Sequence, residues 1–252
     1  MRFPRLINSL FLLALMPALQ GQAATNLVQN GGFELTTNGT NKQLTATGVT
    51  NSGRTTLVGW DSNYQNRSWD AGYNFVLNSD IYTTNASAIA LRSRYDNGTF
   101  NGITASPTGG NVFASDSQYY PGVLSQSISG LQAHTQYTLS FDYALGQQAG
   151  FDKANSNNFW TVSFAGQTQE SSMLNIASGG FSGWRSATMT FTANSAHEVL
   201  SFLASSTASG LPPFLLLDNV ALTAAVPEPE TWGMLLGGLG LLALVARRRK
   251  RA

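Results

Sequence analysis

The chain has 252 residues, no cysteine and a formal net charge of +1 at neutral pH. The missing cysteine excludes disulfides, thiolate metal sites and cysteine nucleophiles. Seven of the 14 basic residues lie at the two ends, so residues 25–226 hold 7 basic and 11 acidic residues, a net charge of −4, which excludes the basic surface that nucleic-acid binding requires.

Residues 1–24 have the pattern of a secretory signal peptide. Two arginines lie among the first five residues, an apolar run follows over 6–19, and small residues occupy 21–24. Cleavage is expected after Ala23 or Ala24. An N-terminal membrane anchor would need a longer apolar run, so the pattern predicts export.

The body, residues 25–223, is predicted to be an all-β domain. Short runs alternate apolar and polar residues, or are rich in β-branched and aromatic residues, and Gly, Asn and Ser separate them. Many short strands at this spacing are typical of a jelly-roll β-sandwich. The expected strands are 57–60, 74–77, 88–91, 111–114, 123–128, 137–143, 159–164, 167–170, 184–191, 199–203 and 214–222.

Two polar stretches, 36–56 and 94–110, are expected to be long loops, which in a compact domain are often functional. The start of the body, 26–28, is expected to lie beside residues 215–217 near its end. No stretch of the body holds a 3.6-residue apolar period long enough to predict a helix.

Aromatic residues in two segments suit a carbohydrate site, where flat rings lie against sugar faces and polar side chains bind hydroxyls. Segment 60–73 is rich in both types, and the pair 119–120 follows Asp116 and Gln118. Trp60 follows an apolar run and is expected in the core instead. The candidate sugar-binding residues are therefore Tyr64, Trp69, Tyr73, Tyr119 and Tyr120.

Few residues point to catalysis. The two histidines, His134 and His197, are expected at a turn and at a strand start, and no nucleophile elbow, zinc-protease motif, EF-hand loop or phosphate-binding loop occurs in the body. A glycosidase needs a pair of carboxylates, and nothing in the pattern selects one. The chain is therefore predicted not to be an enzyme.

Residues 224–252 form a separate segment of three parts: a Pro-Glu-Pro motif, an uncharged run over 231–246, and a basic end. Sixteen uncharged residues would form about 24 Å of helix, slightly short of a roughly 30 Å hydrocarbon layer. We expect one transmembrane helix with its basic end in the cytoplasm and the body outside. The residues that define the segment are Pro227, Glu228, Pro229, Arg247, Arg248 and Arg249.

This order of parts resembles the PEP-CTERM sorting signal of exported proteins in Gram-negative, exopolysaccharide-producing bacteria. The resemblance implies that the segment is held in the inner membrane until an exosortase-type enzyme processes it. The protein would then reach the cell surface or the extracellular space. A permanent tail anchor without processing is the alternative.

Three short motifs in the body, at 26–34, 124–143 and 217–222, resemble galactose-binding-like jelly rolls, including several carbohydrate-binding module families. In calcium-binding members, a Glu of the opening Gly-Phe-Glu motif and an Asp of the closing Asp-x-Val motif hold a structural ion. These positions are Glu34 and Asp218 in this sequence, and oxygen ligands suit calcium. Alternatively, both carboxylates only accept hydrogen bonds from loop backbone.

Together these patterns predict an exported, non-catalytic β-sandwich protein of the cell envelope or exopolysaccharide, with glycan binding as its expected activity. Its expected partners are the inner membrane, an exosortase-type enzyme and extracellular polysaccharide, and its expected cofactor is structural calcium. The alternatives are a secreted polysaccharide hydrolase and a structural matrix or adhesin-like protein without a small ligand.

Overall fold

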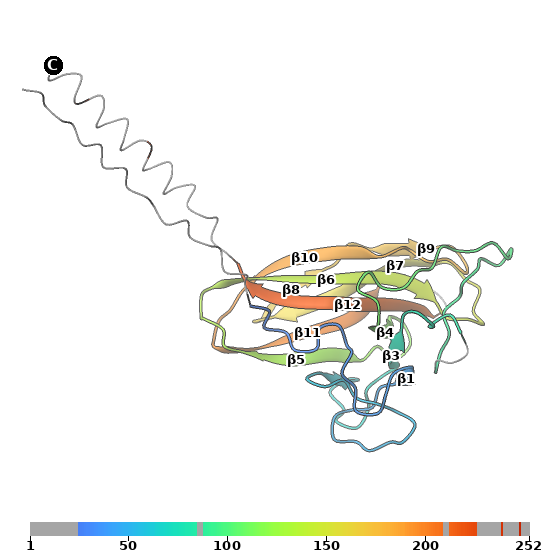
Figure 1. Cartoon of the computed structure of the whole chain (residues 1–252), viewed down its shortest axis with the longest axis horizontal. Helices are drawn as coiled ribbons and strands as arrows, with labels where there is room; N and C mark the ends of the chain where they lie inside the picture. Colours follow the sequence, from blue (N-terminus) through green and yellow to red (C-terminus); the bar gives the residue numbers. More distant parts are fainter. Residues whose placement is uncertain (1–24, 85–87, 209–211, 226–237, 239–246, 248–252) are drawn as a thin grey trace, which may run out of the picture.

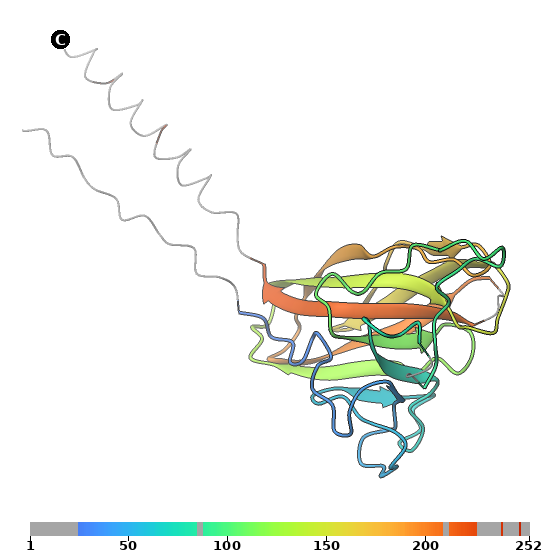
Figure 2. The same cartoon turned by 45° about the vertical axis from the view of Figure 1, so that its right-hand side comes forward.

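The computed structural model describes residues 25–84, 88–208 and 212–225, with Gly238 and Arg247 as single residues. The predicted signal peptide and nearly all of the predicted sorting segment lie outside these residues. Within the body, twelve strands form two sheets that pack face to face (Figures 1 and 2). Among the described residues, no helix has the length and apolar character needed to cross a membrane. The predicted all-β sandwich is confirmed.

The first sheet has the strand order β1 (Lys42–Gln43), β3 (Asn74–Asn78), β4 (Asn111–Asp116), β12 (Pro213–Ala224), β6 (Gln136–Gln147) and β10 (Arg185–Thr192). The second has the order β2 (Asp61–Asn63), β5 (Val123–Ser129), β11 (His197–Ser206), β7 (Asn155–Phe164) and β8 (Gln167–Glu170), and β9 (Leu174–Ile176) pairs with β7. All of these strand pairs are antiparallel.

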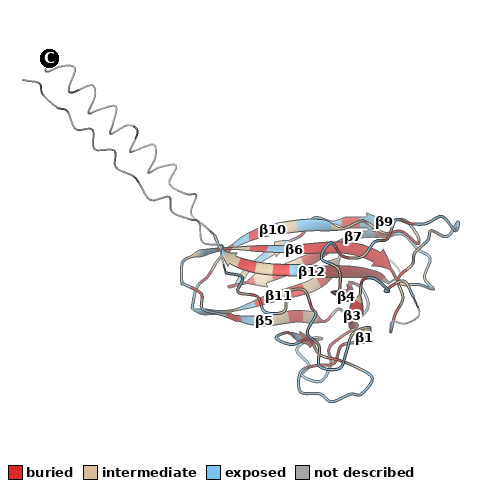
Figure 3. Ribbon diagram, viewed as in Figure 1, coloured by how far each residue is buried: buried red, intermediate tan, exposed pale blue. Residues whose placement is uncertain are grey.

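Period-two alternation places the main core between the sheets. Along the first half of β6, Tyr137, Leu139 and Phe141 are buried while Ser140 is exposed (Figure 3). Successive side chains of a strand point to opposite faces, so one face of β6 packs on the second sheet and the other meets water. Trp160 of β7 lies fully buried at the centre of this core.

A second hydrophobic cluster covers the outer face of the first sheet at one end. Residues 142–147 of β6 are all buried, although the first half of the strand alternates. The described parts of segment 79–110 cover that outer face, so both faces of the first sheet exclude water there. Residues 94–110 of this segment are the second predicted loop. The cluster contains Phe75, Leu77, Tyr82, Ile89, Leu91, Ile103, Val112, Ala114, Ala144, Phe214 and Leu216.

Most predicted strands are present, but two are wrong. Residues 57–60 form a turn, in which the Trp60 amide donates to the Leu57 carbonyl at 3.2 Å, and β2 begins only at Asp61. Residues 88–91 form no strand, because Leu91 packs its apolar side chain into the second cluster and makes only a single bridge to Gln148. The short strands β1 and β9 were not predicted.

The two ends of the body lie side by side, but not as predicted. The Leu27 amide donates to the Leu222 carbonyl at 2.8 Å, and the Leu222 amide donates to Oδ1 of Asn26 at 2.9 Å. Residues 215–217 are unavailable because β4 and β6 already pair with them on both sides. The body therefore begins and ends at the same end of the sandwich (Figure 1).

Candidate functional site

The five candidate sugar-binding residues lie together: four tyrosine rings contact one another in a chain, and Arg67 joins Trp69 to them. Ring centroids are 5.0 Å apart for Tyr64 and Tyr120, 4.6 Å for Tyr119 and Tyr120, and 5.3 Å for Tyr73 and Tyr119. The Arg67 guanidinium carbon lies 5.6 Å from the Tyr64 centroid and 5.5 Å from the Trp69 centroid, linking these two rings by cation–π contacts. We call Tyr64, Trp69, Tyr73, Tyr119 and Tyr120 the aromatic ridge.

Asn74 holds together the two chain segments that carry the ridge. This fully buried residue donates from Nδ2 to the Ser62 hydroxyl at 2.8 Å and to the Gly122 carbonyl at 2.9 Å. Its Oδ1 accepts a 2.6 Å hydrogen bond from the Ser115 hydroxyl. A Cβ at Gly122 would lie 2.1 Å from the Ala71 carbonyl oxygen, so only glycine permits this approach.

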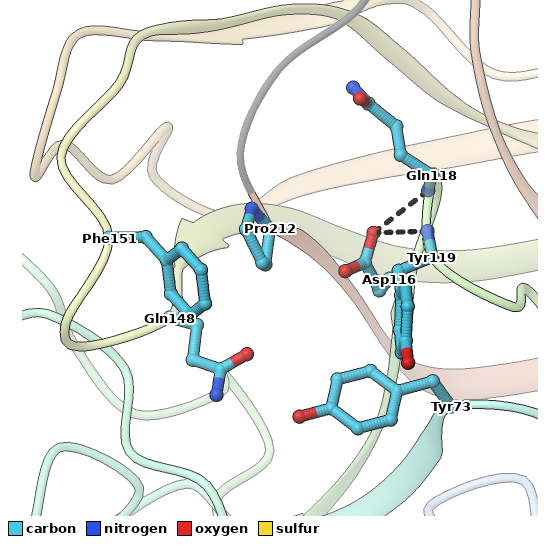
Figure 4. A pocket seen from close by; sticks show the side chains of 7 residues that line it. All are labelled: Tyr73, Asp116, Gln118, Tyr119, Gln148, Phe151 and Pro212. Carbon is cyan, nitrogen blue, oxygen red and sulfur yellow. Dashed lines mark hydrogen bonds between the residues drawn. The ribbon is translucent and has the colours of Figure 1, made fainter.

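The ridge meets a pocket at one end of the first sheet. Neighbouring strands are antiparallel, so the start of β3, the end of β4, the start of β12 and the end of β6 all lie at this end. The residues that connect to these strand ends enclose a cavity of about 400 Å³ (Figure 4). We call it the end pocket; it is lined by Tyr73, Asp116, Gln118, Tyr119, Gln148, Phe151 and Pro212.

Asp116 contributes a buried carboxylate to the end pocket. As the last residue of β4, it continues the face of Val112 and Ala114, which belong to the second cluster. Its Oδ1 accepts hydrogen bonds from the amides of Gln118 at 2.8 Å and Tyr119 at 3.0 Å (Figure 4). Burial raises the pKa of Asp116 to about 6, although these two hydrogen bonds oppose the increase.

Two oxygen atoms in the end pocket have no hydrogen-bond partner within the described part of the chain. They are Oδ2 of Asp116 and Oε1 of Gln148, and both are buried. The two side chains approach the cavity from opposite sides, with Phe151 and Pro212 beside Gln148 and the two tyrosines beside Asp116 (Figure 4). A buried acceptor without a donor costs free energy, and a bound donor would remove that cost.

A second hollow, of about 250 Å³, lies against the same tyrosines. Its lining includes Arg54 and Asp70 together with Tyr73, Tyr119 and Tyr120. Tyr73 and Tyr119 line both cavities, so a ligand built of more than one ring could contact the aromatic ridge and both hollows at once.

The sequence pattern pointed to the ridge but missed most of the end pocket. Asp116 was noted only as a polar neighbour of the tyrosines, and its burial was not predicted. Alternation along 111–116 was the available signal, since it places Asp116 on the same face as Val112 and Ala114. Gln148, Phe151 and Pro212 carry no such signal, because folding brings them to the pocket from distant loops.

The two predicted calcium ligands both reach segment 106–111. Oε1 of Glu34 accepts a 2.8 Å hydrogen bond from the Asn111 amide. Asp218 is fully buried, and its Oδ2 accepts hydrogen bonds from the hydroxyls of Ser106 and Thr108. Burial raises the pKa of Asp218, with these hydroxyls opposing the change. Over the described residues, no three acidic, histidine or cysteine side chains gather closely enough to form a metal site.

The oxygen donors around Asp218 nevertheless suit a hard cation. Its carboxylate lies directly across the strand pair from that of Asp142, and two like charges at such positions repel each other. Calcium prefers oxygen ligands, carboxylates above all. A bound calcium would be held by Asp218 with Ser106 and Thr108, and Glu34 reaches the same segment at the Asn111 amide.

Both histidines lie where the sequence predicted. His134 is exposed in a turn with a φ of 63°, and His197 is exposed at the first position of β11. Neither lines the end pocket or contacts the ridge. The described residues thus bring no histidine to the aromatic site.

The last strand of the sandwich ends at Ala224, where a further motif begins. Residues 225–250 match the PEP-CTERM protein-sorting motif. The chain carries a PEP-CTERM sorting signal. The predicted resemblance is confirmed, and the motif indicates an exported protein that an exosortase processes at the membrane. No curated protein matches the sequence.

Several solved carbohydrate-binding proteins are similar to this chain in structure. TmCBM61 in complex with β-1,4-galactotriose is 12% identical, with a TM-score of 0.42 over 80% of this chain and 100% of that chain. A putative sugar-binding protein from Bacteroides thetaiotaomicron is 12% identical, with a TM-score of 0.41 over 80% of this chain and 100% of its own. The N-terminal cellulose-binding domain of Cellulomonas fimi β-1,4-glucanase C is 18% identical, with a TM-score of 0.28 over 54% and 89%. These similarities identify no ligand for this chain.

Proposed function

We propose that this protein is an exported, non-catalytic glycan-binding protein, sorted through its PEP-CTERM segment and retained at the cell envelope or in extracellular polysaccharide. The signal peptide would deliver the body across the inner membrane, and the C-terminal helix would hold it there until an exosortase-type enzyme acts. The aromatic ridge and the end pocket would then bind polysaccharide. The observation that carries this proposal is a chain of four contacting tyrosine rings, joined through Arg67 to Trp69, beside a pocket that contains buried, unpartnered oxygen atoms.

The chemistry of the site supports a carbohydrate ligand. Trp69, Tyr119 and Tyr120 are 64%, 56% and 46% exposed, an unfavourable arrangement for a cluster of large rings in water. Sugars present apolar C–H faces to such rings and hydroxyls to acceptors such as Asp116. Small-molecule sites commonly have this combination of aromatic walls with a few polar groups, in cavities of roughly 300–1,000 Å³.

The position of the site supports binding away from a membrane. The end pocket lies at the start of β12, and the sorting motif follows its end. Twelve residues of strand separate the two by roughly 35–40 Å. A body tethered through its C-terminus would therefore present the ridge at the end remote from the tether.

A polysaccharide-retention assay with purified residues 25–225 tests this function. We expect retention of at least one bacterial or plant polysaccharide, and a roughly tenfold or greater loss of affinity in Tyr119→Ala, because central aromatic contacts dominate such interfaces. Phe100→Ala is the matched control, since Phe100 is equally exposed, at 57%, but lies outside the ridge. Equal loss in both variants, or release of reducing ends instead of retention, would contradict the proposal.

We also propose that calcium stabilises the body through Asp218. Binding to the folded state alone would add about 2.7 kcal/mol to the free energy of unfolding at a calcium concentration 100 times the dissociation constant. Calorimetry should show a higher melting temperature with calcium than with EDTA, and Asp218→Asn should remove the difference. An unchanged melting temperature in EDTA would show that no structural calcium is bound.

A further inference from the structure

The polar atoms of the end pocket favour one class of glycan over others. This inference rests on the proposed glycan binding. Its two unpartnered polar atoms, Oδ2 of Asp116 and Oε1 of Gln148, are both hydrogen-bond acceptors. Among the described lining residues, none is lysine, arginine or histidine. The described lining residues thus supply no cation to neutralise the Asp116 carboxylate. The amides of Gln118 and Tyr119 donate to its other oxygen, Oδ1.

A ligand that fits would donate hydrogen bonds to the unpartnered oxygens and compensate a buried negative charge. A hydroxyl supplies one donor and no charge, so it leaves the carboxylate uncompensated. An N-acetyl group supplies one N–H donor and no charge, and it adds a carbonyl acceptor beside the two buried acceptors. A primary ammonium supplies three donors, no acceptor and a positive charge.

The aromatic walls favour the same group. Tyr73, Tyr119 and Phe151 surround the cavity together with Pro212 (Figure 4). Aromatic faces attract cations, and the attraction is larger where water is excluded. A carboxylate between aromatic rings therefore combines a direct ion pair with cation–π contacts, and at neutral pH the Asp116 carboxylate is mostly ionised.

We propose that the end pocket selects an amino sugar with a free ammonium group, so that the protein recognises a cationic, de-N-acetylated polysaccharide in preference to a neutral one. Asp116 would accept a charge-assisted hydrogen bond from the ammonium through Oδ2, and Gln148 would accept a second through Oε1. The ridge tyrosines would contact the apolar face of the same sugar.

Matched oligosaccharides test this specificity by calorimetric titration of residues 25–225. The probes are β-1,4-linked oligomers of glucosamine, N-acetylglucosamine and glucose, with the corresponding galactose-configured series. We expect the free-amine member to bind roughly ten- to a hundredfold more tightly than its N-acetyl and hydroxyl counterparts, as for hydrogen bonds to charged groups. Added salt should reduce this preference.

Two variants distinguish the effect of a specific ion pair at Asp116 from the effect of lowering the overall negative charge. Asp116→Asn keeps the acceptor that holds the Gln118 and Tyr119 amides but removes the charge, so it should lose the preference for the amine. Asp152→Asn removes one exposed charge beside Phe151, outside the pocket, and should keep the preference. Equal or tighter binding of the neutral oligomers by the unaltered protein would overturn the amino-sugar inference and leave glycan binding intact. Absence of binding to every oligomer would also overturn the amino-sugar inference, and the polysaccharide-retention assay then decides separately whether the protein binds glycan.

Discussion

Trp160→Ala is expected to destabilise the body by about 3–5 kcal/mol, the range for removing a large aromatic side chain from a core. Trp160 is fully buried between the sheets, and its ring centroid lies 5.9 Å from that of Phe113 and 6.2 Å from that of Phe202. Its indole nitrogen also donates to the Leu216 carbonyl of the opposite sheet at 3.2 Å. The free energy of unfolding of a typical domain is about 5–15 kcal/mol, so the variant would lose a large fraction of its stability.

Urea unfolding followed by circular dichroism measures this effect. Trp69→Ala is the matched control, because it removes the same side chain from an exposed position and should change the free energy of unfolding by about 0.5 kcal/mol or less. Comparable stability of the Trp160 and Trp69 variants would contradict the core described above. No disulfide can compensate for the loss, since the chain has no cysteine.

Asp116 is expected to make the body less stable as the pH rises from 4 to about 7. Burial raises the pKa of Asp116 from 3.8 to about 6, so the folded protein retains a proton that the unfolded chain releases. Its stabilising contribution is complete below pH 3.8 and is lost as the pH rises through 6. An increase of this size in the pKa corresponds to about 3 kcal/mol.

The free energy of unfolding should be measured between pH 4 and pH 7 in the unaltered protein and in Asp116→Asn. The variant carries no titrating group at this position, so the difference between the two proteins isolates Asp116 from Asp218, whose pKa is also raised. We expect the difference to change by up to about 3 kcal/mol across this range. A constant difference would show that the carboxylate is solvated.

The effect of Asp116 on stability and its proposed role in ligand binding are linked. A carboxylate that lowers stability at neutral pH is retained at a cost, and a bound cation would remove that cost. A ligand that pairs with Oδ2 should therefore raise the melting temperature most strongly at neutral pH, where the carboxylate is ionised.

The strand pattern was predictable because burial on one face leaves a period of two in the sequence. Residues 137–143 and 159–170 alternate in this way, and Ala165-Gly166 forms the predicted hairpin turn with positive φ angles of 51° and 73°. The pattern predicted a strand at 88–91, but this apolar run packs against the outer face of the first sheet and forms no strand. A short apolar run has the same sequence signature in either place.

The sequence alone determined the PEP-CTERM sorting motif, the all-β class and the aromatic residues of the ridge, because each depends on local composition or on residues near in sequence. Only the tertiary structure decided that 64–73 and 119–120 form one surface, that Asp116 is buried, and that Gln148, Phe151 and Pro212 lie around it. Antiparallel strand order brings these positions to one end of a sheet, and strand order is set by packing over the whole domain, which no local pattern encodes.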